Sequence, residues 1–263
     1  MYTFIKNNDN TLDDLIEFLN GINVSIKCET ITLHDYTYNL IICEYHNLII
    51  IYTNKWNETI KYNLIHLKLY FLKNSIDSIY INNNLIFYKL DVIQSKINSI
   101  FKLNKRIHAR KTKIITLNYN QVSEFVTKNC LFNPCSEKYK IGLIHNKQLD
   151  MVAQFSKKLN VNRLNNINKT YELIKIISLK DTNVVGGINK IINYFIKLYN
   201  PDDIMTYIDL NWYRSNSFSK LNFELAGITC TKLTSSSHKD KITDLRDINS
   251  GSLKLIKYLK PAL

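Results

Sequence analysis

A basic run near the middle of the chain is the densest group of residues that could carry chemistry. Between residues 102 and 113 it contains six cations and no acidic residue: Lys102, Lys105, Arg106, Arg110, Lys111 and Lys113. Lysine and arginine at this density neutralise phosphates and release condensed counterions, which supplies affinity for nucleic acid whatever its base sequence. The run predicts a phosphate-contacting segment, and a solvated linker is the alternative.

The glycine pair Gly186-Gly187 is a second candidate, because it stands between an expected strand at 171–179 and an expected helix at 188–198. Backbone N–H groups at a helix N-terminus attract anions, and glycine lets an anion approach closely. The same pair also suits tight packing of a helix against a strand. The sequence is compatible with both an anion- or cofactor-binding turn and a packing turn.

Trp212 and Arg214 complete the predicted nucleic-acid contacts. Both follow a strand that is expected at 204–210. The indole of Trp212 is suited to stacking on bases, and Arg214 is suited to contacting phosphate. A structural ion pair between Asp209 and Arg214 is the alternative.

The cysteines form only an unspecific pattern. Cys130 and Cys135 could join His145 or Cys230 around zinc, but the spacing is not that of a zinc motif, and no metal site is predicted. The five cysteines are odd in number, the N-terminus lacks a secretory signal, and no apolar run is long enough for a membrane span. We therefore expect an intracellular, reducing compartment: a bacterial host cytoplasm, a virus-infected cell or an organelle.

The net charge of +13 is distributed unevenly along the 263 residues. Residues 1–100 carry 8 basic and 10 acidic residues, a net of −2, whereas residues 101–263 carry 27 and 12, a net of +15. A hydrophobic content of 45% excludes global disorder. The abundance of Asn, Ile, Lys and Tyr is typical of an AT-rich genome. Charge and composition together favour an anionic partner, DNA or RNA, for the second region.

The first region predicts an α/β domain. Helices are expected at 11–19, 61–73 and 92–101, and strands at 25–33, 38–44, 47–53 and 78–81. Through Asp35, Trp56 and the pair His66 and Lys68, the region resembles the very-short-patch-repair-like PD-(D/E)xK nucleases of bacteriophage homing-type endonucleases.

This resemblance implies a restriction-endonuclease-like fold in which two carboxylates hold Mg²⁺. Asp35 occupies the first acidic position, but Tyr52 stands where the second carboxylate belongs. A phenol stays protonated at neutral pH and does not replace a metal-binding carboxylate. We expect a degenerate nuclease domain, with Asp35 and Glu44 as the catalytic residues only if cleavage persists.

The second region predicts a hairpin of strands at 140–144 and 151–155, followed by the strand, glycine turn and helix described above. A strand at 204–210, a helix at 215–221, a strand at 223–231 and a basic amphipathic helix near the C-terminus complete it. In order and spacing it resembles the GCN5-related N-acetyltransferase-like domain that follows the nuclease domain in those phage proteins.

In acetyltransferases of that family the glycine turn binds the pyrophosphate of coenzyme A through an Arg/Gln-x-x-Gly-x-Gly/Ala pattern. Here Asn183 replaces the Arg or Gln, and Ile188 replaces the small residue. The resemblance therefore implies the fold, while these departures argue against acyl-CoA as a cofactor. We expect no cofactor, apart from Mg²⁺ if the nuclease is active.

These observations predict an α/β (α+β) protein with a degenerate nuclease-like domain at 1–101, a basic linker at 102–113 and an acetyltransferase-like mixed-sheet domain at 114–263. The predicted function is nucleic-acid binding by a protein derived from a phage-type homing endonuclease, without nuclease activity. Three alternatives are a basic subunit recruited into a large nucleoprotein assembly such as a ribosome or viral polymerase, an active metal-dependent DNA endonuclease, and an acyl-CoA-dependent acyltransferase.

Overall fold

The computed structural model describes residues 11–54, 58–163, 166–214, 218–229 and 250–259. The chain divides into two compact units. Unit 1 comprises Met1–Leu90, Leu210–Ser215 and Thr231–Gly251, and unit 2 comprises Asp91–Asp209, Asn216–Cys230 and Ser252–Leu263. The division therefore falls eleven residues before the predicted boundary at 101, and residues 210–214, 250 and 251 also belong to unit 1.

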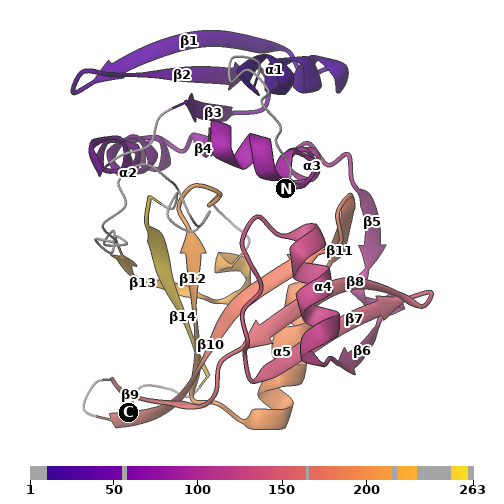
Figure 1. Cartoon of the computed structure of the whole chain (residues 1–263). Coiled ribbons are helices and arrows are strands. Elements are labelled where there is room, and N and C mark those ends of the chain that lie inside the picture. The colour runs from indigo at the N-terminus through magenta and orange to yellow at the C-terminus, as the bar shows by residue number, and fades with distance from the viewer. Residues whose placement is uncertain (1–10, 55–57, 164–165, 215–217, 230–249, 260–263) are drawn as a thin grey trace, which may run out of the picture. The chain divides into compact units, whose positions relative to one another are not determined.

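Unit 1 contains a four-stranded sheet with helices (Figure 1). Its elements are α1 (Thr11–Gly21), β1 (Ile26–Leu33), β2 (Tyr36–Cys43), β3 (Leu48–Thr53), α2 (Glu58–Lys73), β4 (Asp77–Asn82) and the first part of α3 (Asn83–Ile100). The strand order is β1-β2-β3-β4, in which β1, β2 and β3 are antiparallel and β4 is parallel to β3.

Short turns and a continuous apolar core account for this sheet. His34 and Asp35 join β1 to β2 with φ values of 46° and 65°, which is the backbone of a tight two-residue hairpin. Leu15, Ile50 and Ile79 are fully buried at its centre. The helix and strand pattern predicted for this region is confirmed.

The segment 210–214 covers the free edge of β4. The backbone N–H of Tyr80 donates to the carbonyl of Asn211 at 2.9 Å. The ammonium of Lys68, which is buried, donates to the carbonyl of Tyr213 at 2.7 Å and also bonds the carbonyl of Ser78. An edge strand presents unpaired backbone groups, so pairing explains why a sequence-distant segment joins unit 1.

Unit 2 is built on a seven-stranded path in the order β13-β14-β12-β10-β8-β7-β6, with β9 paired to β10 (Figure 1). Its strands are β6 (Lys113–Thr116), β7 (Tyr139–His145), β8 (Gln148–Phe155), β9 (Leu159–Arg163), β10 (Asn166–Ser178), β12 (Asp203–Asp209), β13 (Glu224–Thr229) and β14 (Ser252–Tyr258). Its helices are the second part of α3, α4 (Tyr119–Asn129), α5 (Gly187–Tyr199) and the short 3-10 turn η2 (Ser219–Leu221). Neighbours are antiparallel except β10 and β12, which are parallel.

The two long helices of unit 2 pack on opposite faces of this sheet. Val126 of α4 belongs to an apolar cluster with Val152 of β8. Phe195 of α5 stacks on Phe155 of β8, with ring centroids 3.9 Å apart. Residues 152 and 155 are three apart on one strand, so their side chains point to opposite faces. Each helix therefore buries one side of the sheet.

Two predictions for unit 2 are wrong. Residues 102–113 are not a linker, because they form β5 (Lys105–His108), the 3-10 turn η1 (Ala109–Lys111) and the first residue of β6. The C-terminal basic segment is a strand, β14, which is paired on both sides by β12 and β13. Its hydrophobic residues include Leu253 and Leu255, which alternate with basic residues, as a strand requires. Of the helix expected at 215–221, residues 215–217 lie outside the described part.

Candidate anion-binding site

The two carboxylates expected to hold Mg²⁺ lie far apart. Asp35 is in the turn before β2, and Glu44 follows the last residue of that strand. The eight residues of β2 separate them by more than about 20 Å at a rise of about 3.3 Å per residue. Glu44 instead accepts a 2.5 Å hydrogen bond from the hydroxyl of Ser25. One cation cannot bridge them, and the predicted catalytic pair is wrong.

The other residues considered for a nuclease or metal site are Tyr52, Trp56 and the cysteines. Tyr52, which replaces the second acid, is buried and its hydroxyl donates to the amide oxygen of Asn83. Trp56 lies outside the described residues. Within the described part of the chain, no group of three His, Cys, Asp or Glu side chains is placed to hold a metal ion. Cys135 makes a thiol contact with the Gln154 amide oxygen at 3.7 Å.

The basic run forms an ordered surface feature, which we call the basic ridge and define by its six cations: Lys102, Lys105, Arg106, Arg110, Lys111 and Lys113. All six are exposed, whereas the residues between them at Ile107, Ala109 and Thr112 are buried. The buried residues anchor the segment to unit 2, while the cations on β5, on η1 and at the start of β6 remain exposed. The ridge therefore presents six positive charges to solvent on an immobilised backbone.

The structure places the ridge beside the glycine turn. β5 pairs in parallel with β11 (Thr182–Val185), the strand that leads into Gly186, and Figure 1 shows the two side by side. His108 is the register partner of Val185. A Cβ atom on Gly186 would lie 3.7 Å from the Cβ of Ala109. Two of the sequence-predicted features, 80 residues apart in the chain, are thus neighbours.

The N-terminus of α5 has no side-chain cap. Gly186 is the N-cap residue, with a φ of 78° that favours glycine, and the first turn contains no acidic residue. The first hydrogen bond within the helix runs from the N–H of Lys190 to the carbonyl of Gly186. The N–H groups before it lack intrahelical acceptors and carry the positive end of the helix dipole. An exposed Gly186 and an exposed Asn189 leave this end open to solvent.

Gly187 has a packing role. An added Cβ would stand 2.8 Å from the sulfur of Met151 and 2.9 Å from a methyl group of Val184. The residue at the position of the family's Arg or Gln, Asn183, accepts a 2.9 Å hydrogen bond from the hydroxyl of Ser99. Ile188 is half-buried. Tight packing thus explains Gly187, while Gly186 is required by its backbone conformation.

Sequence reasoning missed Lys190. Its ammonium donates to the carbonyl of Ala109 at 2.8 Å and to the hydroxyl of Thr112 at 3.2 Å, and it also bonds the carbonyl of Thr112. A cation in the first turn of a helix is unfavourable for the helix dipole. A lysine in the first turn of α5 therefore indicates that nearby oxygen atoms accept hydrogen bonds from its ammonium group.

Trp212 and Arg214 belong to unit 1, whereas the ridge belongs to unit 2. Arg214 contacts Asp77 through two nitrogens, at 2.8 and 2.7 Å. The predicted alternative of a structural ion pair is correct in kind, but its acid is Asp77 rather than Asp209. Trp212, two residues before Arg214, is half-buried in the segment 210–214.

No family model matches the chain, and no curated protein matches it. Solved structures are similar to a little over half of it. A Bacillus subtilis acetyltransferase in complex with CoA is 14% identical, with 57% of this chain and 100% of that chain covered at a TM-score of 0.40. The ribosomal-protein-S18-alanine N-acetyltransferase from Escherichia coli is 12% identical, covering 58% and 96% at 0.38.

A third match is the Corynebacterium glutamicum structure described as histone acetyltransferase HPA2 and related acetyltransferase, which is 8% identical, covering 58% and 99% at 0.40. The chain is a mixed α/β protein. The three similar structures are acetyltransferases, and the N-terminal sheet is assigned to no family. Among the described helices, none is long and apolar enough to cross a bilayer.

Proposed function

We propose that unit 2 binds the phosphate backbone of nucleic acid through the basic ridge. The observation that supports this function is the outward placement of all six cations on a backbone fixed by buried residues between them. Six exposed cations within twelve residues carry more charge than one small phosphate ligand neutralises, so they suit a polymer of phosphates better. The uncapped N-terminus of α5, next to the ridge, offers further N–H donors to a phosphate.

Binding of this kind is electrostatic and does not depend on base sequence. Each phosphate contact releases condensed counterions, so the affinity falls steeply with salt. The ridge has no acidic residue of its own to neutralise it. We therefore expect similar affinity for DNA and RNA of mixed sequence.

The test replaces Lys105, Arg106, Arg110 and Lys111 by glutamine in the full chain. Fluorescence anisotropy with a 30-nucleotide single strand, over a series of salt concentrations, measures affinity and its salt slope. Four lost phosphate contacts are expected to reduce the slope of log affinity against log salt by about 3, at about 0.7 per contact.

A matched control removes the same charge elsewhere in unit 2. Lys157, Lys158, Lys197 and Lys220 are all exposed and lie outside the ridge. Their replacement by glutamine is expected to change the slope by less than half as much. Equal effects of the two quadruple variants would show that net charge, not the ridge, provides the binding.

A second candidate function is binding of an acyl-CoA, and it is favoured by the parallel strands β10 and β12. They pair only from Thr170 with Asp203 to Leu173 with Thr206. Beyond that point β10 pairs with β8 and β12 with β14, and a bulge interrupts β10 between Leu173 and Lys175. The opened strand pair, followed by a glycine turn and a helix N-terminus, would suit an extended thioester-bearing ligand with a diphosphate.

Acetyl-CoA is then expected to raise the melting temperature of the full chain. Ile188→Asp, which puts a carboxylate in the first turn of α5, is expected to remove that rise through repulsion of the diphosphate. Asn193→Asp, an exposed position in the middle of the same helix, is the control. No shift with acetyl-CoA in the unmodified protein rejects this candidate and leaves the nucleic-acid proposal intact.

A further inference from the structure

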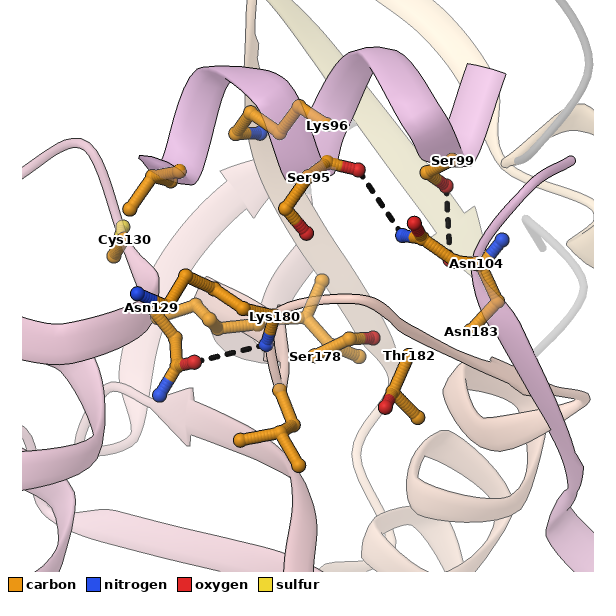
Figure 2. A pocket seen from close by; sticks show the side chains of 14 residues that line it. Ser95, Lys96, Ser99, Asn104, Asn129, Cys130, Ser178, Lys180, Thr182 and Asn183 are labelled. Atoms are coloured by element: carbon orange, nitrogen blue, oxygen red, sulfur yellow. Dashed lines mark hydrogen bonds between the residues drawn. The ribbon is translucent and has the colours of Figure 1, made fainter. Parts of the chain in front are cut away.

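A polar pocket of about 260 Å³ lies in unit 2 where β10 ends. Its walls come from the second part of α3, from Asn104 just before β5, from the end of α4 and from the chain between Ile176 and Asn183 (Figure 2). None of the six cations of the basic ridge lines it. The pocket is therefore separate from the surface proposed to bind nucleic acid.

Hydrogen-bonding groups dominate the lining. Three serines, one threonine and three asparagines contribute hydroxyl and amide groups, and Lys96 and Lys180 contribute ammonium groups. Among the described residues that line the pocket none is acidic, although Lys180 pairs with nearby Asp91. Four aliphatic side chains complete the wall. The pocket thus combines a positive bias with many neutral donors and acceptors.

Hydrogen bonds within the wall hold its shape before any ligand arrives. The amide oxygen of Asn129 accepts the backbone N–H of Lys180 at 2.9 Å. The hydroxyl of Ser95 accepts the backbone N–H of Asp181 at 2.8 Å. Because the connection after β10 is bound to both α3 and α4, a ligand would meet a preorganised wall.

One buried group in the wall has an unused acceptor. Asn104 is only 8% exposed, and its amide nitrogen donates to the carbonyl of Ser95 at 3.0 Å. Its amide oxygen is buried and has no hydrogen-bond partner among the described residues. An unpaired buried acceptor costs about 1–3 kcal/mol.

The volume sets the size of the ligand. At about 30 Å³ per water molecule, the pocket has space for on the order of nine waters, which corresponds to a ligand of on the order of ten non-hydrogen atoms. We propose that the pocket binds a small hydroxylated anion, a short polyol with one phosphate or carboxylate group. The Lys96 ammonium would pair with the anion, and the serine, threonine and asparagine side chains would bind the hydroxyls.

Glycerol 3-phosphate is a probe of this chemistry and size. Calorimetric titration of the full chain is expected to show saturable binding of glycerol 3-phosphate and at least fivefold weaker binding of inorganic phosphate and of glycerol. Lys96→Gln and the near-isosteric Thr182→Val are each expected to weaken binding at least fivefold. Lys158→Gln, which removes an exposed charge outside the pocket, is expected to leave it unchanged.

The pocket also contains a local reporter, the half-buried thiol of Cys130. Glycerol 3-phosphate is expected to slow alkylation of Cys130 by iodoacetamide and to leave the exposed Cys28 in unit 1 unaffected, as measured by mass spectrometry of the two peptides. Protection must persist in Arg110→Gln with Lys111→Gln, which removes ridge charge.

Two results would overturn the proposal. One is the absence of saturable binding of glycerol 3-phosphate. The other is binding that Lys96→Gln and Thr182→Val leave intact, or that gives Cys130 no protection, because the ligand would then occupy another place. Either result leaves the nucleic-acid proposal untouched, since that proposal depends on the ridge alone.

Discussion

The ammonium of Lys190, in the first turn of α5, donates a 2.8 Å hydrogen bond to the carbonyl of Ala109, at the centre of the basic ridge. It also bonds Thr112, so a single side chain connects the helix to the backbone that displays the ridge cations. A half-buried positive group thereby holds a run of exposed positive groups in place. The order of the ridge follows from hydrogen bonding to its carbonyls rather than from its own charges.

Replacing Lys190 with methionine is expected to destabilise unit 2 by about 2 kcal/mol. Loss of a charged hydrogen-bond donor costs about 1.5–3 kcal/mol, and this ammonium is only partly buried. Urea denaturation measures the stability, and hydrogen exchange is expected to rise over residues 105–112. Lys197→Met, at an exposed position of the same helix, is the control and should stay within about 0.5 kcal/mol. Unchanged exchange at the ridge would contradict the anchoring role.

Gly187→Ala is expected to destabilise the chain by about 1–3 kcal/mol, because the added methyl would overlap both Met151 and Val184. Thermal or urea denaturation measures the loss. Gly21→Ala is the matched control, since nothing lies within 4 Å of an added Cβ there. A neutral Gly187→Ala would mean that the turn is loose enough to adapt, and that packing does not explain the glycine.

Asp150 produces a specific pH dependence. It is 2% exposed, one carboxylate oxygen has no hydrogen-bond partner among the described residues, and burial raises its pKa while His145 and Lys105 oppose the rise. Above the unfolded pKa of about 3.9 the unfolded chain has released this proton while the folded chain still holds it. The carboxyl therefore lowers stability as pH rises from about 4 through its raised folded pKa, and the loss is constant above that.

Asp150→Asn removes this titration. The stability of the variant minus that of the unmodified protein is expected to increase with pH across that interval and then level off, as measured by urea denaturation between pH 4 and 7. Asp181→Asn, at an exposed position, is the control. A difference that does not change with pH would show that Asp150 is ionised alike in the folded and unfolded chains.

The ion pair between Asp203 and Arg163 is more buried than the other described ion pairs of unit 2. Asp203 is fully buried and accepts hydrogen bonds from Arg163 at 3.1 Å, Asn168 at 3.0 Å and Thr170 at 3.1 Å. Asp203→Asn is expected to cost about 3 kcal/mol, because it leaves a largely buried arginine without its counter-charge.

The exposed pair between Glu124 and Lys128 provides the comparison. Both side chains are exposed, at 67% for Lys128 and 70% for Glu124. Glu124→Gln is therefore expected to change the free energy of unfolding by less than about 0.5 kcal/mol. Both variants are measured by urea denaturation under the same conditions. Similar losses would contradict the assignment of the stabilisation to burial.

Local patterns were sufficient for most elements. The hairpin of β7 and β8 and the apolar stripe of α5 were predictable, because alternation and helical periodicity are properties of neighbouring residues. The C-terminal basic segment is a strand and not the predicted helix: its residues 253–255 alternate as in a strand, but its sequence does not show that β12 and β13 lie on either side to pair with it. A short sequence does not contain its own pairing partners.

The candidate site also has features that the sequence determines and features that only the tertiary structure decides. Sequence alone determined that the six cations and the glycine pair exist and that the charge is concentrated after residue 100, because composition and order are local facts. Only the tertiary structure decided that Arg214 pairs with Asp77, and that the ridge lies beside the N-terminus of α5. Strand direction, register and long-range hydrogen bonds such as that of Lys190 set these distances, and each depends on residues far apart in the chain.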